Sequence, residues 1–273
     1  MSMSTVAQQR STGQVLGSWR TAWLIVEAHW LWYRRHWQAS LFSTGLQPLL
    51  FLAAMGLGFG SQVEPGEATG GVSYLHFVAP AMLLLGVVFT AVGESSFPVL
   101  SGFKWQQHYI AMIATPVRPG QIVLGLLQWM SLRLLLAGTA YSLVATLFGA
   151  WLNPGAVLVV LVGVLTGLAC SAPVMALASV TYDEGTRFVL LMRLVVVPMT
   201  LFAGTFFPIE SIPLALRWLA WISPLWHGTE LARGVALGGL EPLAFAGHAA
   251  YLIALVAVGA ALATRGFTRR LVV

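Results

Sequence analysis

Residues 202–239 read FAGTFFPIESIPLALRWLAWISPLWHGTELARGVALGG, and this stretch decides what kind of protein the chain forms. It is too apolar for a loop in water, yet Pro208, Pro213 and Pro224 prevent it from forming one uninterrupted helix. Long hydrophobic runs precede and follow it. Backbone breaks at membrane depth survive only when they are buried in protein or line a wet cavity. The stretch therefore predicts two short helices that enter the membrane and return, as in a pore or a transporter.

The composition of the whole chain indicates an integral membrane protein. Of its 273 residues, 58% are hydrophobic and only 8% are charged, whereas about a quarter of a soluble domain is charged. The net charge of +5 then reports membrane orientation rather than nucleic-acid binding. Cys170, the single cysteine, lies in an apolar run and is interpreted as a small buried residue. No cleavable signal is expected, because the first apolar run begins only near residue 40.

Six runs are long enough to cross a bilayer, since a span needs about 20 mostly apolar residues. They are residues 41–60, 75–100, 122–150, 157–180, 188–207 and 243–264. The fold class predicted from them is an all-α integral membrane protein, with one transmembrane domain over residues 1–273. The interrupted stretch, taken as residues 209–238, forms a re-entrant helical hairpin before the last span.

The basic residues are distributed unequally between the two sides of these spans. If both termini lie on one side, only Arg217 and Arg233 fall on the other, while Arg133 and Arg193 lie within spans. The ten residues on the terminal side are Arg10, Arg20, Arg34, Arg35, Lys104, Arg118, Arg187, Arg265, Arg269 and Arg270. The positive-inside rule then predicts that both termini are cytoplasmic.

The N-terminal segment, residues 14–38, carries a helical stripe of large side chains spaced alternately by three and four residues. The stripe consists of Leu16, Trp19, Trp23, Val26, Trp30, Tyr33 and Trp37. Tryptophan prefers the headgroup region, so the segment predicts an amphipathic helix lying in the inner membrane interface. An ordinary helix packed on the base of the bundle is a compatible alternative.

A short helix over residues 104–116 is predicted on the cytoplasmic side, between the second and third spans. Thr115 and Pro116 end it, and no helix breaker precedes them in its centre. Its aromatic and apolar side chains are candidate anchors for the groove of a partner protein. The alternative is that these side chains rest on the inner membrane surface. The candidate anchors are Trp105, His108, Tyr109, Ile110 and Met112.

Glu94 and Arg133 lie inside predicted spans and are expected to face the protein interior, because charged residues are costly in lipid. A structural ion pair or polar contact between Glu94 and Arg133 is favoured over contact of Arg133 with a substrate headgroup. Arg193 is interpreted as extending to the membrane surface, or else as an entrance site for an anionic headgroup.

Other residues near the interrupted stretch are candidates for a path or for chemistry. Phe202, Phe206 and Phe207 are candidates to line an apolar exit, although core packing explains them equally well. His227, Glu230 and Arg233 are spaced by three residues, and polar anchoring of the second re-entrant helix is preferred to a catalytic role. His227 together with Glu230 is weak evidence for an enzyme, because an active site would need more converging polar side chains.

The sequence contains no GxxxxGK[ST], HExxH or CxxC motif, and its six histidines are scattered. The chain is therefore expected to bind no cofactor or metal of its own and to be no enzyme. Two groups of short motifs instead suggest a family. The first is MIATPV at residues 112–117, followed by IVLG at 122–125. The second is FAGTFFP at 202–208, followed by PLWH at 224–227 and LAR at 231–233.

In their order and spacing these motifs resemble the permease subunits of type-2 ABC exporters over nearly the whole chain. The branch that they most resemble contains the nodulation-factor lipooligosaccharide exporter and daunorubicin-type drug-resistance permeases. The resemblance implies a homo- or heterodimer of permease chains in membrane lipid, driven by separate ABC ATPase subunits that hold ATP and Mg. It also implies that residues 104–116 form the coupling helix and that residues 209–238 cap the outer end of the path. The coupling residues that it implies are Lys104, Trp105, His108, Tyr109, Met112, Thr115 and Pro116.

The function expected from this resemblance is ATP-driven export of an amphipathic substrate across the bacterial plasma membrane. Lipids, lipid-linked glycans and hydrophobic drugs are the candidate substrates, and no nucleic-acid partner is expected. The candidate path residues are Glu94, Arg133, Arg193, Phe202, Phe206 and Phe207. The alternatives are a polysaccharide-chain exporter of the same fold, an integral membrane enzyme, and a structural or signalling membrane partner.

Overall fold

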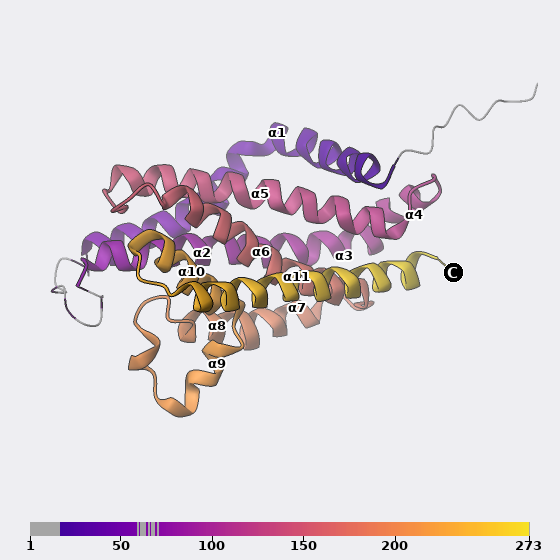
Figure 1. Cartoon of the computed structure of the whole chain (residues 1–273). Coiled ribbons are helices and arrows are strands. Elements are labelled where there is room, and N and C mark those ends of the chain that lie inside the picture. Colours follow the sequence, from indigo (N-terminus) through magenta and orange to yellow (C-terminus); the bar gives the residue numbers. More distant parts are fainter. Residues whose placement is uncertain are drawn as a thin grey trace, which may run out of the picture.

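The described part of the computed structural model, residues 17–58, 60, 64, 66, 69 and 71–272, is helical and contains no strand. Its main helices run side by side, as Figure 1 shows. The first six are α1 (Ser18–Phe51), α2 (Tyr74–Ser95), α3 (Phe97–Lys104), α4 (His108–Ile113), α5 (Pro119–Leu147) and α6 (Ala156–Ser179). The others are α7 (Thr186–Leu191), α8 (Val197–Phe202), α9 (Arg217–Trp221), α10 (Pro224–Leu237) and α11 (Pro242–Leu271).

Different helices lie at the two ends of the bundle. Helix α4, the beginning of α1 and the end of α11 lie at one end, while α9 and α10 lie toward the other (Figure 1). We call these the α4 end and the α10 end. Both ends of the described chain are therefore at the α4 end, as the six-span topology requires. Which membrane face this end occupies stays a prediction.

Four helical segments are long and apolar enough to cross a membrane, among the residues that the structure describes. They are Tyr74–Lys104, Pro119–Leu147, Val157–Ser179 and Pro242–Leu271. They correspond to the second, third, fourth and sixth predicted spans. The first predicted span coincides with the second half of α1 and the π-helical segment Leu52–Gly58, where many side chains lie outside the description. The fifth is divided among α7, a π-helical segment (Met192–Val196) and α8, so six spans remain a prediction.

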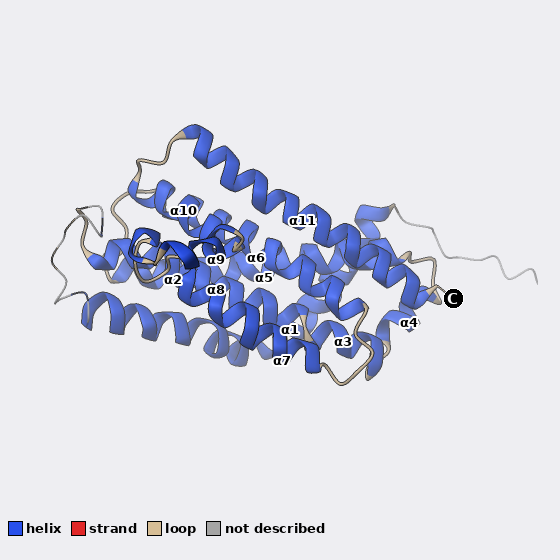
Figure 2. Ribbon diagram, turned by 90° about the horizontal axis from the view of Figure 1, so that it is seen from below, coloured by secondary structure: helices blue, strands red, loops and turns tan. Residues whose placement is uncertain are grey.

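Small residues bring the central helices together. A Cβ placed on Gly259 of α11 would lie 2.7 Å from the backbone nitrogen of Pro173 in α6. A Cβ placed on Gly167 of α6 would lie within 2.8 Å of side-chain atoms of Val87. Close approach through glycine is typical of membrane helices, where packing rather than hydrophobicity holds helices together. Figure 2 shows α11 along one flank of the bundle, beside α6 and α10.

Helix α1 lies along α5 and runs in the same direction, and its place in the membrane interface stays a prediction. Ser18 accepts a hydrogen bond from Gln121, and Ile25 packs against Gly125 one turn further on. The predicted stripe is divided: Val26 and Tyr33 are buried, whereas Trp19 is 69% exposed. The physical reason is that Gly125 lets the α1 backbone approach, so α5 covers one side of the stripe. Leu16, and the side chain of Trp37, lie outside the described residues.

The helix predicted over residues 104–116 is shorter in the structure. Helix α3 continues to Lys104, and Gln107, with a φ of 53°, makes a sharp left-handed turn before α4 begins at His108. Helix α4 ends at Ile113, where the backbone N–H of Thr115 turns back to the carbonyl of Met112. The expected coupling helix is thus six residues long.

The interrupted stretch has its two short helices, α9 and α10, after two single 3₁₀ turns at Ile209–Ser211 and Leu214–Leu216. Pro224 occupies the first turn of α10, where its missing N–H costs nothing. The Oγ of Ser223 caps the same helix by accepting from the backbone N–H of Trp226. These breaks follow from the prolines that the sequence analysis identified. Their depth in a membrane stays a prediction.

Candidate functional site

A cavity of about 880 Å³ lies among α1, α2, α3, α4 and α5, in the half of the bundle toward the α4 end. This volume is within the range of small-molecule sites, roughly 300–1,000 Å³. Its wall combines residues from segments that are far apart in the sequence. The cavity contains residues from both the predicted path and the predicted coupling helix: Glu94, Arg133, His108, Tyr109 and Met112.

One face of α2 forms part of the cavity wall and carries small side chains. Gly86, Thr90, Gly93 and Glu94 line it, and their spacing places them on the same side of the helix. No atom lies within 4 Å of the position that a Cβ on Gly93 would occupy. Gly93 therefore leaves open space where a larger residue would reach into the cavity.

The predicted contact between Glu94 and Arg133 is present in the cavity wall. The Nε of Arg133 is 3.7 Å from the Oε1 of Glu94. The Arg133 side chain is only 4% exposed, and its guanidinium carbon lies 4.8 Å from the centre of the Tyr33 ring. The side chain of Glu94 is 39% exposed. Arg133 is thus covered by its partners, and the carboxylate is the more accessible member of the pair.

Helix α1 and helix α5 form an aromatic wall. Trp32 and Tyr33 come from α1 and Trp129 from α5, and the Tyr33 and Trp129 rings meet edge to face at 5.8 Å. The Nδ1 of His29 is 2.8 Å from the carbonyl oxygen of Ile25. A carbonyl only accepts hydrogen bonds, so Nδ1 carries the hydrogen and the Nε2 of the neutral ring is left as an acceptor.

Helix α4 closes the cavity at its end. Tyr109 is 1% exposed and packs against Phe103 of α3 at 4.8 Å and Phe267 of α11 at 5.3 Å between ring centres. Gly102 is required here, because a Cβ on it would overlap the Tyr109 ring. Burial raises the pKa of Tyr109 far above its ordinary value, so its hydroxyl stays neutral. The pKa of His108 is lowered, first by burial and then by the nearby His29.

The seven predicted coupling residues divide into three groups. Trp105, which is 52% exposed, lies on the outer surface with Thr115 and Pro116. His108, Tyr109 and Met112 line the cavity, and Lys104 pairs with Glu184 at 2.6 Å. Tyr109 and Met112 face the interior in this conformation, and their part in binding a partner stays a prediction. The physical reason for this orientation is that residues three apart share a face on so short a helix, and that face packs inward.

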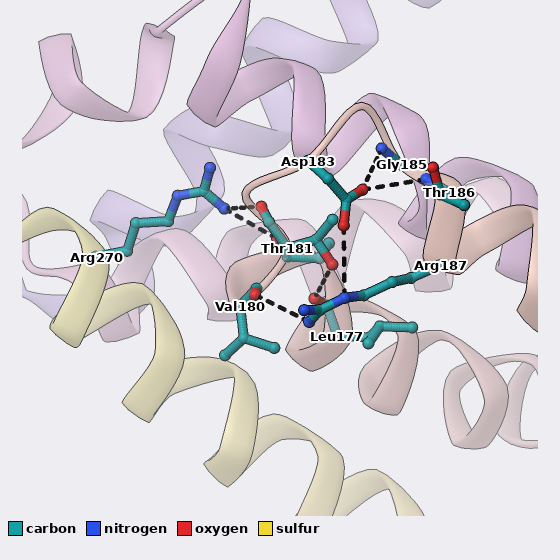
Figure 3. A network of polar contacts seen from close by, with 9 residues as sticks. Leu177, Val180, Thr181, Asp183, Gly185, Thr186, Arg187 and Arg270 are labelled. Carbon is teal, nitrogen blue, oxygen red and sulfur yellow. Dashed lines mark hydrogen bonds and ion pairs between the residues drawn. The ribbon is translucent and has the colours of Figure 1, made fainter.

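Polar contacts fix the turn between α6 and α7, as Figure 3 shows. The Nη1 of Arg270 donates to the carbonyls of Ala178, Ser179 and Thr181 at the end of α6, at 3.1, 3.3 and 2.7 Å. Asp183 accepts from the backbone N–H groups that begin α7. Helix α11 and the α6–α7 turn are therefore joined at the α4 end.

The remaining predicted path residues lie elsewhere. Arg193 is exposed on the π-helical segment between α7 and α8. Phe202 ends α8, and Phe207 is 41% exposed beyond it. The backbone carbonyl of Phe206 accepts a hydrogen bond from the hydroxyl of Tyr74 at the start of α2. None of these four residues lines the cavity, and their part in a path stays a prediction.

The polar residues of α10 anchor that helix. Arg233 donates to the carbonyls of Phe77 and Thr205, at 3.2 and 3.1 Å, and its guanidinium covers the Phe77 ring. His227 lies 2.8 Å from His248 of α11. These contacts hold α10 against α2, α11 and the turn after α8, in agreement with the structural reading preferred from the sequence.

Sequence reasoning missed several residues of the cavity. Gly93, Phe89 and Trp129 were not identified, although they lie beside the charged residues that were. The available signal was spacing: Gly86 and Gly93 stand two helical turns apart, and Trp129 stands one turn before Arg133. His29 and Tyr33 could be identified as cavity residues only from the pairing of α1 with α5, which the spacing alone does not specify.

Long apolar helices around a ligand-sized cavity, with an ion pair in its wall, suit the subunit of a membrane transporter. The chain belongs to the ABC-2 type transporter family, whose sequence profile matches residues 20–237. This membership confirms the family resemblance found in the sequence.

The chain is also similar to proteins named Nodulation protein J. It is 30% identical over 225 residues to the one from Rhizobium leguminosarum bv. trifolii, covering 81% of this chain and 82% of that protein. It is 29% identical over 257 residues to the one from Rhizobium meliloti (strain 1021), covering 93% and 94%. It is 30% identical over 229 residues to the one from Neorhizobium galegae, covering 82% and 83%. The similarity extends over most of both proteins in each case.

Proposed function

We propose that the chain is the membrane-spanning subunit of an ATP-driven exporter in the bacterial plasma membrane. It would work with a second permease chain and with separate ATPase subunits that hold ATP and Mg. The observation that carries the proposal is the position of α4. This short helix has one face on the outer surface and the other in the wall of the cavity.

Helix α4 is built to transmit a push from outside the bundle. A partner that contacts Trp105 and Ile110, which are 52% and 49% exposed, acts on a helix that Tyr109 fixes to its neighbours. Because Tyr109 is wedged against Phe103 and Phe267, movement of α4 displaces α3 and α11. Close-packed cores transmit such displacements because they have little free volume to absorb them.

The same movement changes the cavity, since His108 and Met112 line it from α4. In our proposal, closure of the ATPase subunits pushes α4 and reshapes the cavity around its substrate. The segment that contains α9 and α10 forms the outer gate, which opens when α2 and α11 shift. Arg233 supports this role, because its bonds to Phe77 and Thr205 tie the segment to α2.

The wall of the cavity favours an amphipathic substrate over a bare polysaccharide chain. Among the described lining residues, aromatic and aliphatic side chains surround the ion pair of Glu94 with Arg133. Sugar chains need many hydrogen-bond partners along their length, whereas an amphiphile needs apolar contact and one polar anchor.

Purification in mild detergent tests the proposal. We expect an ATPase chain to co-purify with the tagged protein, and ATP to drive uptake of substrate into inverted vesicles. The paired variant Trp105→Ala with Ile110→Ala should abolish co-purification while the melting temperature stays near that of the wild type. If no ATPase chain associates with the wild-type protein, the proposed function is wrong.

A further inference from the structure

The accessible charge in the cavity is negative, although the cavity contains an arginine. Arg133 is 4% exposed and is covered by the Tyr33 ring and by Glu94, at 4.8 and 3.7 Å. Glu94 keeps 39% of its side chain exposed on the same wall. An occupant of the cavity therefore meets the carboxylate first and the guanidinium only behind it.

The polar atoms beside Glu94 are also hydrogen-bond acceptors. The hydroxyl of Thr90 donates its hydrogen to the carbonyl of Gly86 at 2.9 Å, which leaves its oxygen lone pairs. The Nδ1–H of His29 is used on Ile25, which leaves Nε2 as an acceptor in the neutral ring. Thr90, His29 and Glu94 all line the cavity. A ligand group that donates several hydrogen bonds matches this set.

The rest of the wall suits a cation with an apolar body. Trp32, Phe89 and Trp129 present aromatic rings, whose faces attract cations. Leu85, Leu126, Met130 and Met175 supply aliphatic and thioether surface. A carboxylate, acceptors and aromatic rings together form a site for an organic ammonium group.

We propose that this cavity binds an amphiphile that carries a protonated primary amine, with the ammonium beside Glu94 and the alkyl chain along Leu126 and Met130. The proposal rests on the cavity being the substrate site of the proposed exporter. With an ammonium placed there, the Glu94 carboxylate would bridge two cations, Arg133 and the ligand. The ammonium would donate hydrogen bonds to the carboxylate lone pairs that Arg133 does not use. An anionic headgroup would instead face the carboxylate and be repelled by it.

Three fluorescent probes that differ in one end group test this directly. They are N-dansyl-1,10-diaminodecane, which is cationic, neutral N-decyl dansylamide, and anionic 11-(dansylamino)undecanoic acid. Binding to the purified full-length chain in nanodiscs at pH 7.5 is measured by dansyl fluorescence. We expect the amine to bind about tenfold or more tightly than the other two, as a hydrogen bond to a charged group implies.

Glu94→Gln should weaken binding of the amine about tenfold and leave binding of the neutral probe unchanged. Unchanged binding of the neutral probe also shows that the variant is folded. Glu184→Gln is the matched control, because it removes a carboxylate outside the cavity and should affect none of the probes. Glu94→Asp, which keeps the charge, should retain more amine binding than Glu94→Gln.

The inference is overturned if the amine binds no more tightly than the acid or the neutral probe. It is also overturned if Glu94→Gln and Glu184→Gln have equal effects on binding of the amine. If Glu94→Gln does not fold, the ranking of the three probes on the wild-type chain decides alone. Binding without any associated ATPase would leave this inference intact and refute the proposed function. ATP-driven transport without preference for the amine would support the proposed function and refute this inference.

Discussion

At the scale of single residues, Gly93 of α2 contributes to how much space the cavity has. Gly93 has open space where a side chain would project, whereas Gly167 of α6 sits against Leu134 and Val87. Identical residues thus have opposite roles in the same bundle. One leaves a cavity open, and the other lets two helices touch.

Gly93→Leu should fill part of the cavity without straining the helix. We expect the melting temperature to stay equal or rise, because glycine costs a helix interior roughly 0.5–1 kcal/mol relative to alanine. Binding of the neutral dansyl probe should fall about tenfold, since each lost methylene contact is worth about 0.8 kcal/mol. Gly167→Ala is the control, and its overpacking should cost roughly 1–3 kcal/mol in thermal stability. A Gly93→Leu protein that binds the probe normally would contradict this view of the cavity.

His108 should make stability depend on pH. Burial, and then the nearby His29, lower its pKa in the folded protein below the unfolded value of about 6.5. The unfolded chain therefore binds the proton more readily, and stability is lost as pH falls from about 6.5 toward the folded pKa. Melting curves between about pH 7.5 and 5 should show this loss, and His108→Gln should reduce it. An identical pH profile for the variant would exclude His108 as the cause.

At the scale of elements, α4 shows how six residues can serve two surfaces. Tyr109 is buried among the rings of Phe103 and Phe267, while Ile110, the next residue, is 49% exposed. Consecutive helical residues point about 100° apart, so neighbours in the sequence face different surroundings. The sharp turn at Gln107 sets which of them faces inward.

The two residues should therefore separate stability from partner binding. Tyr109→Ala removes a large buried ring and should cost about 3–5 kcal/mol of stability, seen as a lower melting temperature in detergent. Ile110→Ala should leave melting nearly unchanged and weaken association with the ATPase chain, measured by co-purification. If Ile110→Ala destabilises the protein as much as Tyr109→Ala does, the outer face of α4 is not a free surface.

At the scale of the whole molecule, the topology brings both ends of the described chain to the α4 end. Arg270, Lys104 and Arg187 lie there with the turn between α6 and α7. The positive-inside rule predicts that this end is cytoplasmic. The same rule predicts that the α10 end, which holds α9 and α10, faces outward.

Cysteine labelling can establish this orientation, because Cys170 is buried and should not react. Leu214→Cys lies at a site that is 73% exposed near α9, and Ile110→Cys lies on α4. We expect a membrane-impermeant maleimide to label Leu214→Cys in spheroplasts and Ile110→Cys only in inverted vesicles. The opposite pattern would place the α4 end outside.

The sequence by itself determined the long apolar helices and the breaks at Pro208, Pro213 and Pro224. It also predicted that the two ends of the described chain lie at the same end of the bundle. These are local properties, set by hydropathy, by proline chemistry and by the order of charges along the chain. It also identified Glu94 and Arg133 as partners, because charges within spans must find each other.

Only the tertiary structure decided which faces meet. In water an apolar face marks the core, but in a membrane the lipid-facing side is as apolar as the interior, so hydropathy does not distinguish them. The stripe on α1 could therefore be recognised in the sequence, but its pairing with α5 could not. The length of α4, the inward turn of Tyr109 and the cavity shared by α1, α2, α4 and α5 all depend on such pairings. Helical spacing shows which residues share a face, and only packing shows what that face contacts.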